Sequence, residues 1–276
     1  MNFDMNTCWS RSVELIQANF QLLLIVAAVF LLLPNVAIYV LVPDMQSIID
    51  PAADPEVVFA QMASMAGPLI LGGLLSLTFQ FAGNASMVAL MGDARPTVGQ
   101  AIASGIKTVP SLFVVAVLAF LIYMFGAFVI IMPFSLLGIL TGAPGIGIIG
   151  FLPIIVFVAW LFSRFSMSMP VMVLEGTLNP ITAIGRSWTL TKPKQWPITG
   201  FWTIIIVIMF VVSLIFTSVF GLVAAIAGSG LVSALILGLT SGVTGMIYGM
   251  VICAIATAMH GQLNGPSIET IEDTFG

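Results

Sequence analysis

Arg164 is the side chain whose position most needs a chemical explanation. From Gly145, the start of its apolar run, it follows nineteen uncharged residues, and it lies among the serines Ser163, Ser166 and Ser168. A charged group at the middle of a bilayer costs about 2.5 to 3.5 kcal/mol on insertion scales, so such residues usually face a polar cavity or a lipid headgroup. The sequence therefore predicts either an arginine that snorkels to the interface or an anion site in one leaflet.

Three further cations follow Arg164, namely Arg186, Lys192 and Lys194. A turn rich in glycine and proline after Glu175 would bring its carboxylate back to the Arg186 guanidinium, where two oriented hydrogen bonds can form. We interpret this pair as a structural clasp rather than a catalytic pair. The two lysines would each contribute about 1 kcal/mol against an anionic leaflet. All four cations are candidate ligands for lipid headgroups or other anions.

Gln80 and Asn84 form a polar pair with i, i+4 spacing inside another apolar run. Such residues either hydrogen-bond to neighbouring helices, which is worth about 0.6 to 2 kcal/mol each, or line a cavity.

Four glycines near the end of the chain follow each other at steps of four, three and four: Gly238, Gly242, Gly245 and Gly249. This spacing places them on one helical face and is typical of close helix packing in membranes. The face could pack within the chain, which we favour, or against a second copy or a partner protein.

The sequence offers no recognisable catalytic or metal site. His260 is the one histidine, and Cys8 and Cys253 have no metal-ligand spacing, so we expect no metal and no cofactor. The pattern G-x-G-x-x-G at 145–150 has no strand before it and no acidic residue about 20 positions later, which excludes a dinucleotide site. No acidic residue lies centrally in an apolar run, so an intramembrane hydrolase is not expected either. Seven lysines and arginines are too few for a nucleic-acid interface.

The composition predicts a membrane protein, because 60% of the 276 residues are hydrophobic and 7% are charged, against about 25% charged in soluble domains. A hydrocarbon core of about 30 Å needs about 20 apolar residues per helix. Six runs meet this length, at Phe20–Val42, Ala66–Met91, Ser111–Ile139, Gly145–Leu174, Ile198–Ala227 and Leu231–Met259. We therefore expect an all-α membrane protein with six transmembrane helices in one domain, 1–265, followed by a short acidic tail, 266–276.

The cations are sorted to one side of these spans. They lie before the odd-numbered spans or toward the end of the fourth (Arg11, Arg95, Lys107, Arg164, Arg186, Lys192 and Lys194), whereas the first loop on the other side is acidic. Because lysine and arginine concentrate on the cytoplasmic side, both termini are predicted to be cytoplasmic.

An internal repeat accompanies this layout. Similar Gly-containing turns at Gly92, Gly176 and Gly261 are separated by 84 and 85 residues. The unit would be a short amphipathic helix plus a transmembrane hairpin, used three times in a pseudo-threefold arrangement, with the amphipathic helices in the cytoplasmic interface. Alternatively, the amphipathic segments are the polar ends of long spans, although Pro110 and Pro197 favour a break at two of the junctions.

One stretch resembles a known family. It reads Arg164-x5-Pro170-x4-Glu175-Gly176-x3-Pro180-x2-Ala183-x2-Arg186-Ser187-Trp188-x-Leu190-Thr191-x4-Trp196. This pattern is similar to the membrane domain attached to some bacterial glycerophosphoryl diester phosphodiesterases, a domain related to the YciC-like inner-membrane proteins. Because thirteen residues follow Leu263, the resemblance implies a free-standing membrane domain, without the phosphodiesterase barrel, in a bacterial cytoplasmic (inner) membrane.

The leading functional hypothesis is a non-enzymatic membrane protein that engages headgroups of the bilayer, with anionic phospholipids as the expected partners, or supports envelope lipid metabolism. A transporter or channel for a small solute or lipid is the first alternative, with a water path past Gln80 and Arg164. The second is a scaffold that recruits membrane proteins or a second copy through the glycine face.

Overall fold

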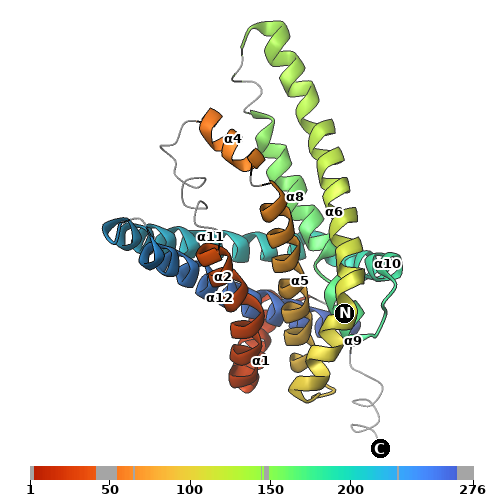
Figure 1. Cartoon of the computed structure of the whole chain (residues 1–276). Coiled ribbons are helices and arrows are strands. Elements are labelled where there is room, and N and C mark those ends of the chain that lie inside the picture. The colour runs from red at the N-terminus through yellow and green to blue at the C-terminus, as the bar shows by residue number, and fades with distance from the viewer. Residues whose placement is uncertain are drawn as a thin grey trace, which may run out of the picture. The chain divides into compact units, whose positions relative to one another are not determined.

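The computed structural model describes residues 3–41, 55–64, 66–143, 145, 149–228 and 230–265. Over these residues the chain is helical and contains no strand (Figure 1). Six of the helical segments are long and apolar enough to cross a bilayer. The prediction of an all-α chain with six helices long and apolar enough to span a membrane is therefore confirmed, and such helices indicate a multi-pass membrane protein.

Some predictions fall outside the described residues. These are the acidic tail 266–276, the end of the first span at Val42, the acidic loop residues Asp44, Asp50 and Asp54, and residues 146–148 at the start of the fourth span.

The helices follow one another in a simple order. The elements are α1 (Met5–Ala27), the π-helix η1 (Ala28–Leu32), α2 (Leu33–Leu41), α4 (Pro55–Ser64), α5 (Ala66–Met91), α6 (Val98–Thr141), α8 (Phe151–Phe165), α9 (Ser168–Leu174), α10 (Pro180–Thr191), the 3-10 turn η2 (Lys192–Lys194), α11 (Gln195–Ile226) and α12 (Leu231–Asn264).

The amphipathic segments are not all separate helices. The first forms the beginning of α1 and the second the beginning of α6, so both are continuous with the spans that follow. The third is a helix of its own, α10, which the turn η2 separates from α11. The placement of these segments in the membrane interface stays a prediction.

Prolines affect these helices less than expected. Pro110 lies inside α6 and does not end the helix, so the predicted break there is wrong. Pro110 removes one backbone N–H donor from the helix. In hydrocarbon the other backbone groups can form hydrogen bonds only within the helix, so α6 continues past the proline. Pro34 is accommodated by the π-turn η1, in which the Leu33 N–H donates to the Ala28 carbonyl, five residues back. Pro197 lies in the first turn of α11, where its missing N–H costs little.

Serine side chains accompany a break in the fourth span. The Ser163 hydroxyl donates to the Trp160 carbonyl at 2.7 Å, and the Ser166 hydroxyl donates to the Ser163 carbonyl at 2.8 Å. Such bonds offer the backbone an alternative to the helical ladder. The helix α8 ends at Phe165, one residue after Arg164, and α9 begins at Ser168.

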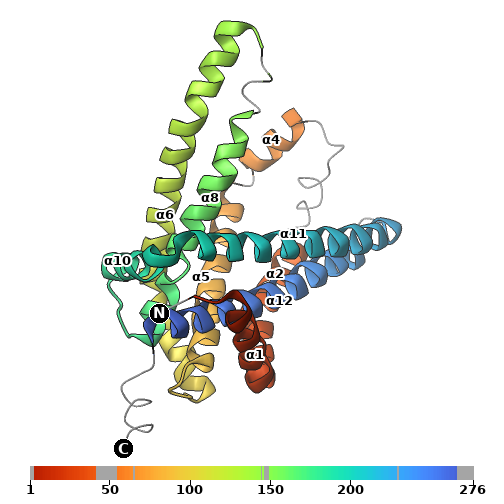
Figure 2. The ribbon, with the colours of Figure 1, turned by 180° about the vertical axis from the view of Figure 1, so that it is seen from behind.

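The described residues divide into two compact units. Among them, unit 1 consists of those within 3–13, 110–207 and 255–265, and unit 2 of those within 14–109 and 208–254. In unit 1, α8 runs beside α6 (Figures 1 and 2), and a Cβ at Gly126 would lie 2.3 Å from the Phe157 ring. The start of α1 also packs in this unit, since Cys8 donates to the Ile255 carbonyl at 3.9 Å.

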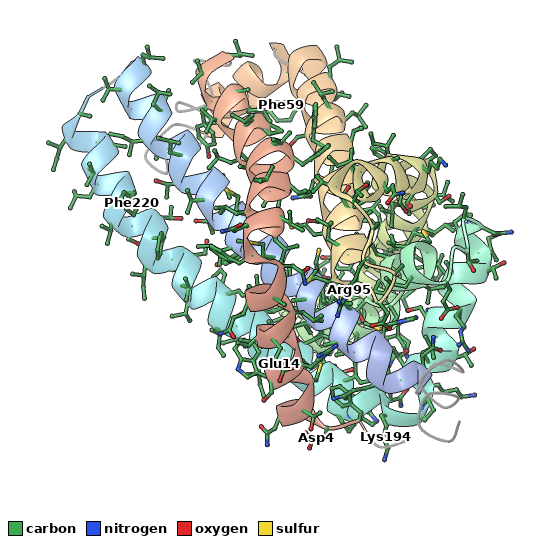
Figure 3. The ribbon with its side chains drawn as sticks, turned by 90° about the horizontal axis from the view of Figure 1, so that it is seen from below. Asp4, Glu14, Phe59, Arg95, Lys194 and Phe220 are labelled. Carbon is green, nitrogen blue, oxygen red and sulfur yellow. The ribbon has the colours of Figure 1, made fainter. Side chains whose placement is uncertain are left out.

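Unit 2 contains the paired parts of α11 and α12, which run side by side (Figure 2). Tyr248 of α12 donates its hydroxyl hydrogen bond to the Met209 carbonyl of α11. Apolar side chains stand out from the helices (Figure 3), and Phe59 of α4 is 75% exposed. So large an apolar surface is typical of helices that face lipid.

Candidate functional site

Arg164 lies in the last turn of α8, and its side chain donates hydrogen bonds to residues of α10 and α11. Only 4% of its surface is exposed. One terminal nitrogen, Nη1, donates to the Thr191 hydroxyl at 3.1 Å and to the Trp188 carbonyl at 3.4 Å. The other, Nη2, donates to the Gln195 side-chain carbonyl. Arg164 is thus buried inside unit 1.

Two tryptophan rings enclose the guanidinium. The Arg164 Cζ atom lies 5.5 Å from the centroid of Trp160 and 5.3 Å from that of Trp188. The two rings meet edge to face, with their centroids 5.6 Å apart. A desolvated cation over an indole face gains about 2 kcal/mol or more. The rings therefore offset part of the cost of burying the charge.

The positive charge of Arg164 has no carboxylate partner among the described residues. Its acceptors are two neutral side chains and one backbone carbonyl, and the ion pairs described in unit 1 join other residues. Its Nε atom is buried and has no hydrogen-bond partner. A buried ion normally needs both a counter-charge and filled hydrogen bonds, because removing it from water costs several kcal/mol. The guanidinium therefore keeps an unpaired charge and a free Nε donor, which an anionic acceptor fits.

The short helix α10 positions the site. Asn179 caps its first turn by accepting from the backbone N–H groups of Ile181 at 3.0 Å and Thr182 at 3.3 Å. Pro180 follows the cap at the favoured first helical position. One turn before its end, Ser187 donates to the Arg164 carbonyl at 2.5 Å. The cap thus fixes the helix that carries the Trp188 ring.

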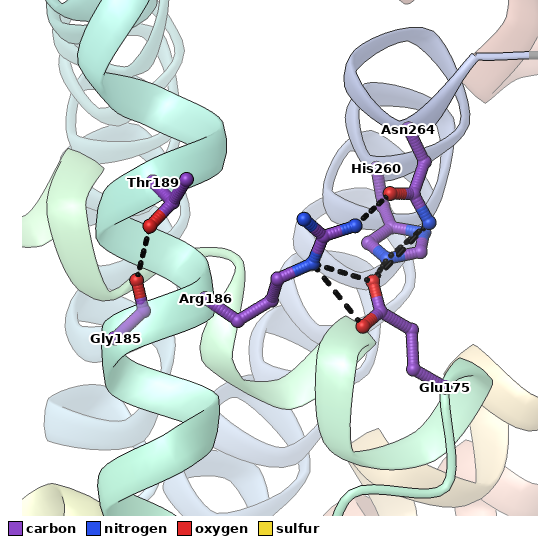
Figure 4. A network of polar contacts seen from close by, with 6 residues as sticks. All are labelled: Glu175, Gly185, Arg186, Thr189, His260 and Asn264. Carbon is purple, nitrogen blue, oxygen red and sulfur yellow. Dashed lines mark hydrogen bonds and ion pairs between the residues drawn. The ribbon is translucent and has the colours of Figure 1, made fainter.

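A second polar cluster joins the ends of α9 and α12 to α10 (Figure 4). The structure brings Glu175 and Arg186 into contact, with 3.3 Å between Glu175 Oε2 and Arg186 Nε. His260 Nε2 lies 2.9 Å from Glu175 Oε1, and Asn264 donates to the same oxygen at 3.2 Å. Arg186 Nη2 in turn donates to the Asn264 carbonyl oxygen at 2.5 Å. One carboxylate therefore links three helical segments.

The pKa of Glu175 reflects these neighbours. Burial alone would raise the pKa of its carboxyl, but the hydrogen bond with His260 and the positive charge of Arg186 outweigh burial, so the pKa lies below its ordinary value. The carboxylate is consequently ionised at neutral pH and serves as the acceptor of the cluster.

Lys192 and Lys194 both belong to the turn η2 between α10 and α11. Lys192 is exposed and Lys194 is half-buried. Trp196, two residues further on, is 62% exposed. Exposed tryptophan and lysine together are typical of the headgroup level of a membrane protein.

Gln80 and Asn84 lie in unit 2, apart from the unit that contains Arg164. Gln80 is exposed, whereas the Asn84 side-chain oxygen is buried without a partner. The Asn84 backbone carbonyl accepts from the Cys253 thiol at 3.4 Å.

The glycine face of α12 contacts the first span within unit 2. A Cβ at Gly238 would lie 3.1 Å from the Val36 Cα atom, and one at Gly242 would lie 3.1 Å from the Leu32 Cα atom. A Cβ at Gly249 would lie 2.5 Å from a Leu31 methyl group, whereas one at Gly245 would meet only an Asn35 nitrogen at 3.8 Å. These glycines allow close approach of helices within the chain.

Sequence analysis did not single out Trp160, Gln195, Asn264 or the contact of His260 with Glu175. Trp160 could have been found, since it precedes Arg164 by one helical turn and shares its face. The other contacts depend on tertiary structure. Among the described residues no group of three or more histidine, cysteine, aspartate and glutamate side chains could hold a metal ion.

Comparisons with family models, curated proteins and solved structures found no match to the chain.

Proposed function

We propose that this multi-pass membrane protein is non-enzymatic and binds phospholipid headgroups at the cytoplasmic leaflet of a bacterial inner membrane. The binding residues would be Arg164, Arg186, Lys192 and Lys194. One observation carries the proposal: Arg164 is buried, keeps an unpartnered Nε donor and has no carboxylate counter-charge among the described residues. An anionic headgroup would supply the missing charge.

The surroundings of Arg164 agree with a site for a polar group. Because α8 ends one residue after Arg164 and α9 begins at Ser168, the guanidinium lies at a break within the fourth span, Phe151–Leu174. Lys192 is exposed, and the distribution of lysine and arginine along the sequence predicts that it lies on the same, cytoplasmic side of the membrane as Arg164. The resemblance of 164–196 to the membrane domains of phosphodiesterases agrees with a role at phospholipids and supplies no substrate.

The test is native mass spectrometry of the full chain purified from bacterial membranes in mild detergent. The wild-type protein is expected to retain anionic phospholipids. Arg164→Ala, Arg186→Ala and the double variant Lys192→Ala with Lys194→Ala are each expected to lower the retained amount.

A matched control removes two cations elsewhere. Arg95 and Lys107 are both exposed and belong to unit 2, so their double alanine variant loses two positive charges without changing a residue of the proposed site. Thermal unfolding of each variant shows whether it is folded. Equal lipid retention by folded Arg164→Ala, Arg186→Ala and wild-type protein would refute the headgroup site.

Transport is a second candidate function, favoured by the buried, unpartnered side-chain oxygen of Asn84 in α5. A water path would make neighbouring positions reactive. In a background with Cys8→Ser and Cys253→Ala, cysteine introduced at position 80 should react with a small aqueous thiol reagent in membranes. Failure to react under conditions that label a loop position would count against transport. Scaffolding through the glycine face is not proposed, because that face is covered by the first span within unit 2.

A further inference from the structure

Arg186 is one of the proposed headgroup ligands, and its guanidinium is already engaged within the protein (Figure 4). Its Nε atom lies 3.3 Å from Glu175 Oε2 and 3.4 Å from Glu175 Oε1, and its Nη2 atom donates to the Asn264 side-chain oxygen. An anionic headgroup must compete with the Glu175 carboxylate for this cation. A second cation that took over Glu175 would therefore release Arg186 for the lipid.

His260 is placed to become that second cation. Its Nε2 atom lies 2.9 Å from Glu175 Oε1. Because an ionised carboxylate can only accept, the Nε2 atom of the neutral ring carries the hydrogen, and a further proton on Nδ1 makes the ring a cation. Histidine is the side chain that ordinarily changes charge between pH 5 and 8. A modest fall in pH can thus create a second positive charge beside Glu175.

The other charges of the cluster do not change in that range. Burial would raise the pKa of the Glu175 carboxyl, but the hydrogen bond with His260 and the charge of Arg186 outweigh burial and hold that pKa below its ordinary value. The carboxylate therefore stays ionised throughout the range. The Arg186 guanidinium stays protonated as well. His260 is consequently the group of this cluster that titrates.

The start of α1 also contacts this end of α12. The Asp4 backbone carbonyl accepts from Gln262 at 3.4 Å, and the Cys8 thiol donates to a backbone carbonyl of α12 at 3.9 Å. The charged side chains of this segment, Asp4 and Arg11, are exposed, and the Asp4 carboxylate accepts from the backbone of α1 itself. Among the described residues, the charged group in contact with His260 is therefore Glu175.

Burial decides which cation keeps the carboxylate. The His260 side chain is 7% exposed, and the Arg186 side chain is 41% exposed. A buried cation depends on its counter-charge because water cannot replace it, whereas an exposed guanidinium is solvated when its partner is lost. The shorter contact with Glu175, 2.9 Å against 3.3 Å, also belongs to His260. Once both groups are charged they repel each other, so Arg186 is the one that leaves. Asn264, which is exposed, then bonds to water instead.

We propose that protonation of His260 releases Arg186 from Glu175 and so strengthens the binding of an anionic phospholipid headgroup. This inference rests on the proposed function and adds its regulation by pH. At about pH 8 Arg186 is held by Glu175, and at about pH 5.5 it is free to pair with a headgroup. The released guanidinium stays on α10, the helix whose Trp188 ring lies over Arg164, so it adds to the binding residue already proposed there.

The test is a binding titration of the full chain in mild detergent at about pH 8 and about pH 5.5, at one ionic strength. The probe is short-chain phosphatidylglycerol with a fluorescent label on its acyl chain, followed by fluorescence anisotropy. Its phosphate diester keeps one negative charge over this range, so a change in affinity belongs to the protein. A cation that faces an anionic lipid contributes about fivefold in affinity, so the wild type should bind about fivefold more tightly at the lower pH. Equal or weaker binding there would overturn the proposal.

Matched variants locate the effect. His260→Gln keeps a side-chain N–H for Glu175 but cannot gain a charge, and Arg186→Gln lacks the cation to be released. In both variants the increase in affinity at low pH should disappear. Arg95→Gln is the control, because it removes an exposed cation of unit 2 and should keep the increase. Thermal unfolding shows whether each variant is folded, and an undiminished increase in folded His260→Gln would refute the proposed release of Arg186.

A second measurement needs no variant. His260 is the one histidine of the chain, so protein that carries isotope-labelled histidine gives NMR signals from a single imidazole ring. These signals report directly whether the ring is neutral or charged. The ring is expected to be neutral at about pH 8 and charged at about pH 5.5. A ring that stays neutral at the lower pH would also overturn the proposal.

The outcomes separate this inference from the proposed function. If phosphatidylglycerol binds equally at both pH values and Arg164→Ala weakens its binding, headgroup binding stands and the release of Arg186 is wrong. If the wild-type protein binds no phosphatidylglycerol at either pH, both are refuted.

Discussion

Gly105 tests the packing of unit 2 most directly, because its helix α6 meets α5 there without room for a methyl group. A Cβ at this position would lie 2.2 Å from the Ser86 hydroxyl and 2.5 Å from the Ala82 carbonyl oxygen. The Ser86 hydroxyl donates to that same carbonyl at 2.6 Å, so it cannot turn away without losing a hydrogen bond. We predict that Gly105→Ala destabilises the protein.

The size of the effect follows from three contributions. Alanine is favoured over glycine in a helix by about 0.8 to 1.0 kcal/mol. Overpacking costs about 1 to 3 kcal/mol, and loss of the serine hydrogen bond adds about 0.5 to 1.5 kcal/mol. The net free energy of unfolding should fall by about 0.5 to 3.7 kcal/mol. At about 2 to 4 °C per kcal/mol, the thermal midpoint should fall by about 1 to 15 °C.

Gly99→Ala is the matched control on the same helix. A Cβ at Gly99 meets nothing within 4 Å, so this variant gains the helix propensity without a clash. Both variants are compared with the wild type by thermal unfolding in one detergent, followed by tryptophan fluorescence. A Gly105→Ala midpoint equal to or above that of Gly99→Ala would refute the close contact of α5 and α6.

Three other predictions concern single side chains. Glu175→Gln should lose about 1 to 3 kcal/mol of stability at pH 7, whereas Asp93→Asn, which alters an exposed carboxylate, should stay within about 0.5 kcal/mol of the wild type by thermal unfolding. Because the pKa of Glu175 is lowered in the folded protein, the stabilisation from its carboxylate is complete above the ordinary pKa of 4.5. This stabilisation disappears as the pH falls through the lowered pKa. A stability difference between wild type and Glu175→Gln that stays constant down to pH 3 would contradict this. Asn179→Ala removes the cap of α10 and should cost about 1 kcal/mol, and an unchanged thermal midpoint would show that the cap contributes nothing. Gly249→Leu should abolish the monodisperse peak in size-exclusion chromatography, while Gly221→Leu, where a Cβ meets nothing within 4 Å, should preserve it.

The spans could be predicted because length and apolar composition are local properties of a segment. The ends of the helices could not, since they depend on individual backbone groups. Pro110 was expected to separate two helices, yet α6 continues through it. The break that does occur follows Phe165, where serine hydroxyls bond to carbonyls three residues earlier. Sequence patterns treat proline as a stronger helix breaker than serine. In this apolar setting the order is reversed, because the helix continues through Pro110 and breaks next to the serines.

The candidate site was predictable only as far as its contacts are local. Arg164 stands out by its charge in an apolar run, and Glu175 and Arg186 are eleven residues apart across a turn. His260, by contrast, lies 85 residues after Glu175. It precedes Gly261 as Glu175 precedes Gly176, so the repeat places the two residues at equivalent positions, whereas in the structure they are in contact. Nothing in the local sequence indicates that two equivalent positions touch.

The helix α10 connects the two polar clusters of unit 1, and this connection decides how variants must be interpreted. Arg186 contacts Glu175, Ser187 donates to the Arg164 carbonyl, and the Trp188 ring covers the Arg164 guanidinium. Three consecutive residues of a helix point in directions about 100° apart, so one turn of α10 can serve both clusters. A variant that frees Arg186 from Glu175 is therefore expected to disturb Trp188 as well.

Loss of lipid in Arg186→Ala alone would not distinguish a direct headgroup contact from a displaced α10. Glu175→Ala separates the two, because it removes the acceptor of Arg186 and leaves all four cations in place. If Glu175→Ala loses lipid as Arg186→Ala does, Arg186 acts by positioning α10; if Glu175→Ala retains lipid, Arg186 binds the headgroup itself.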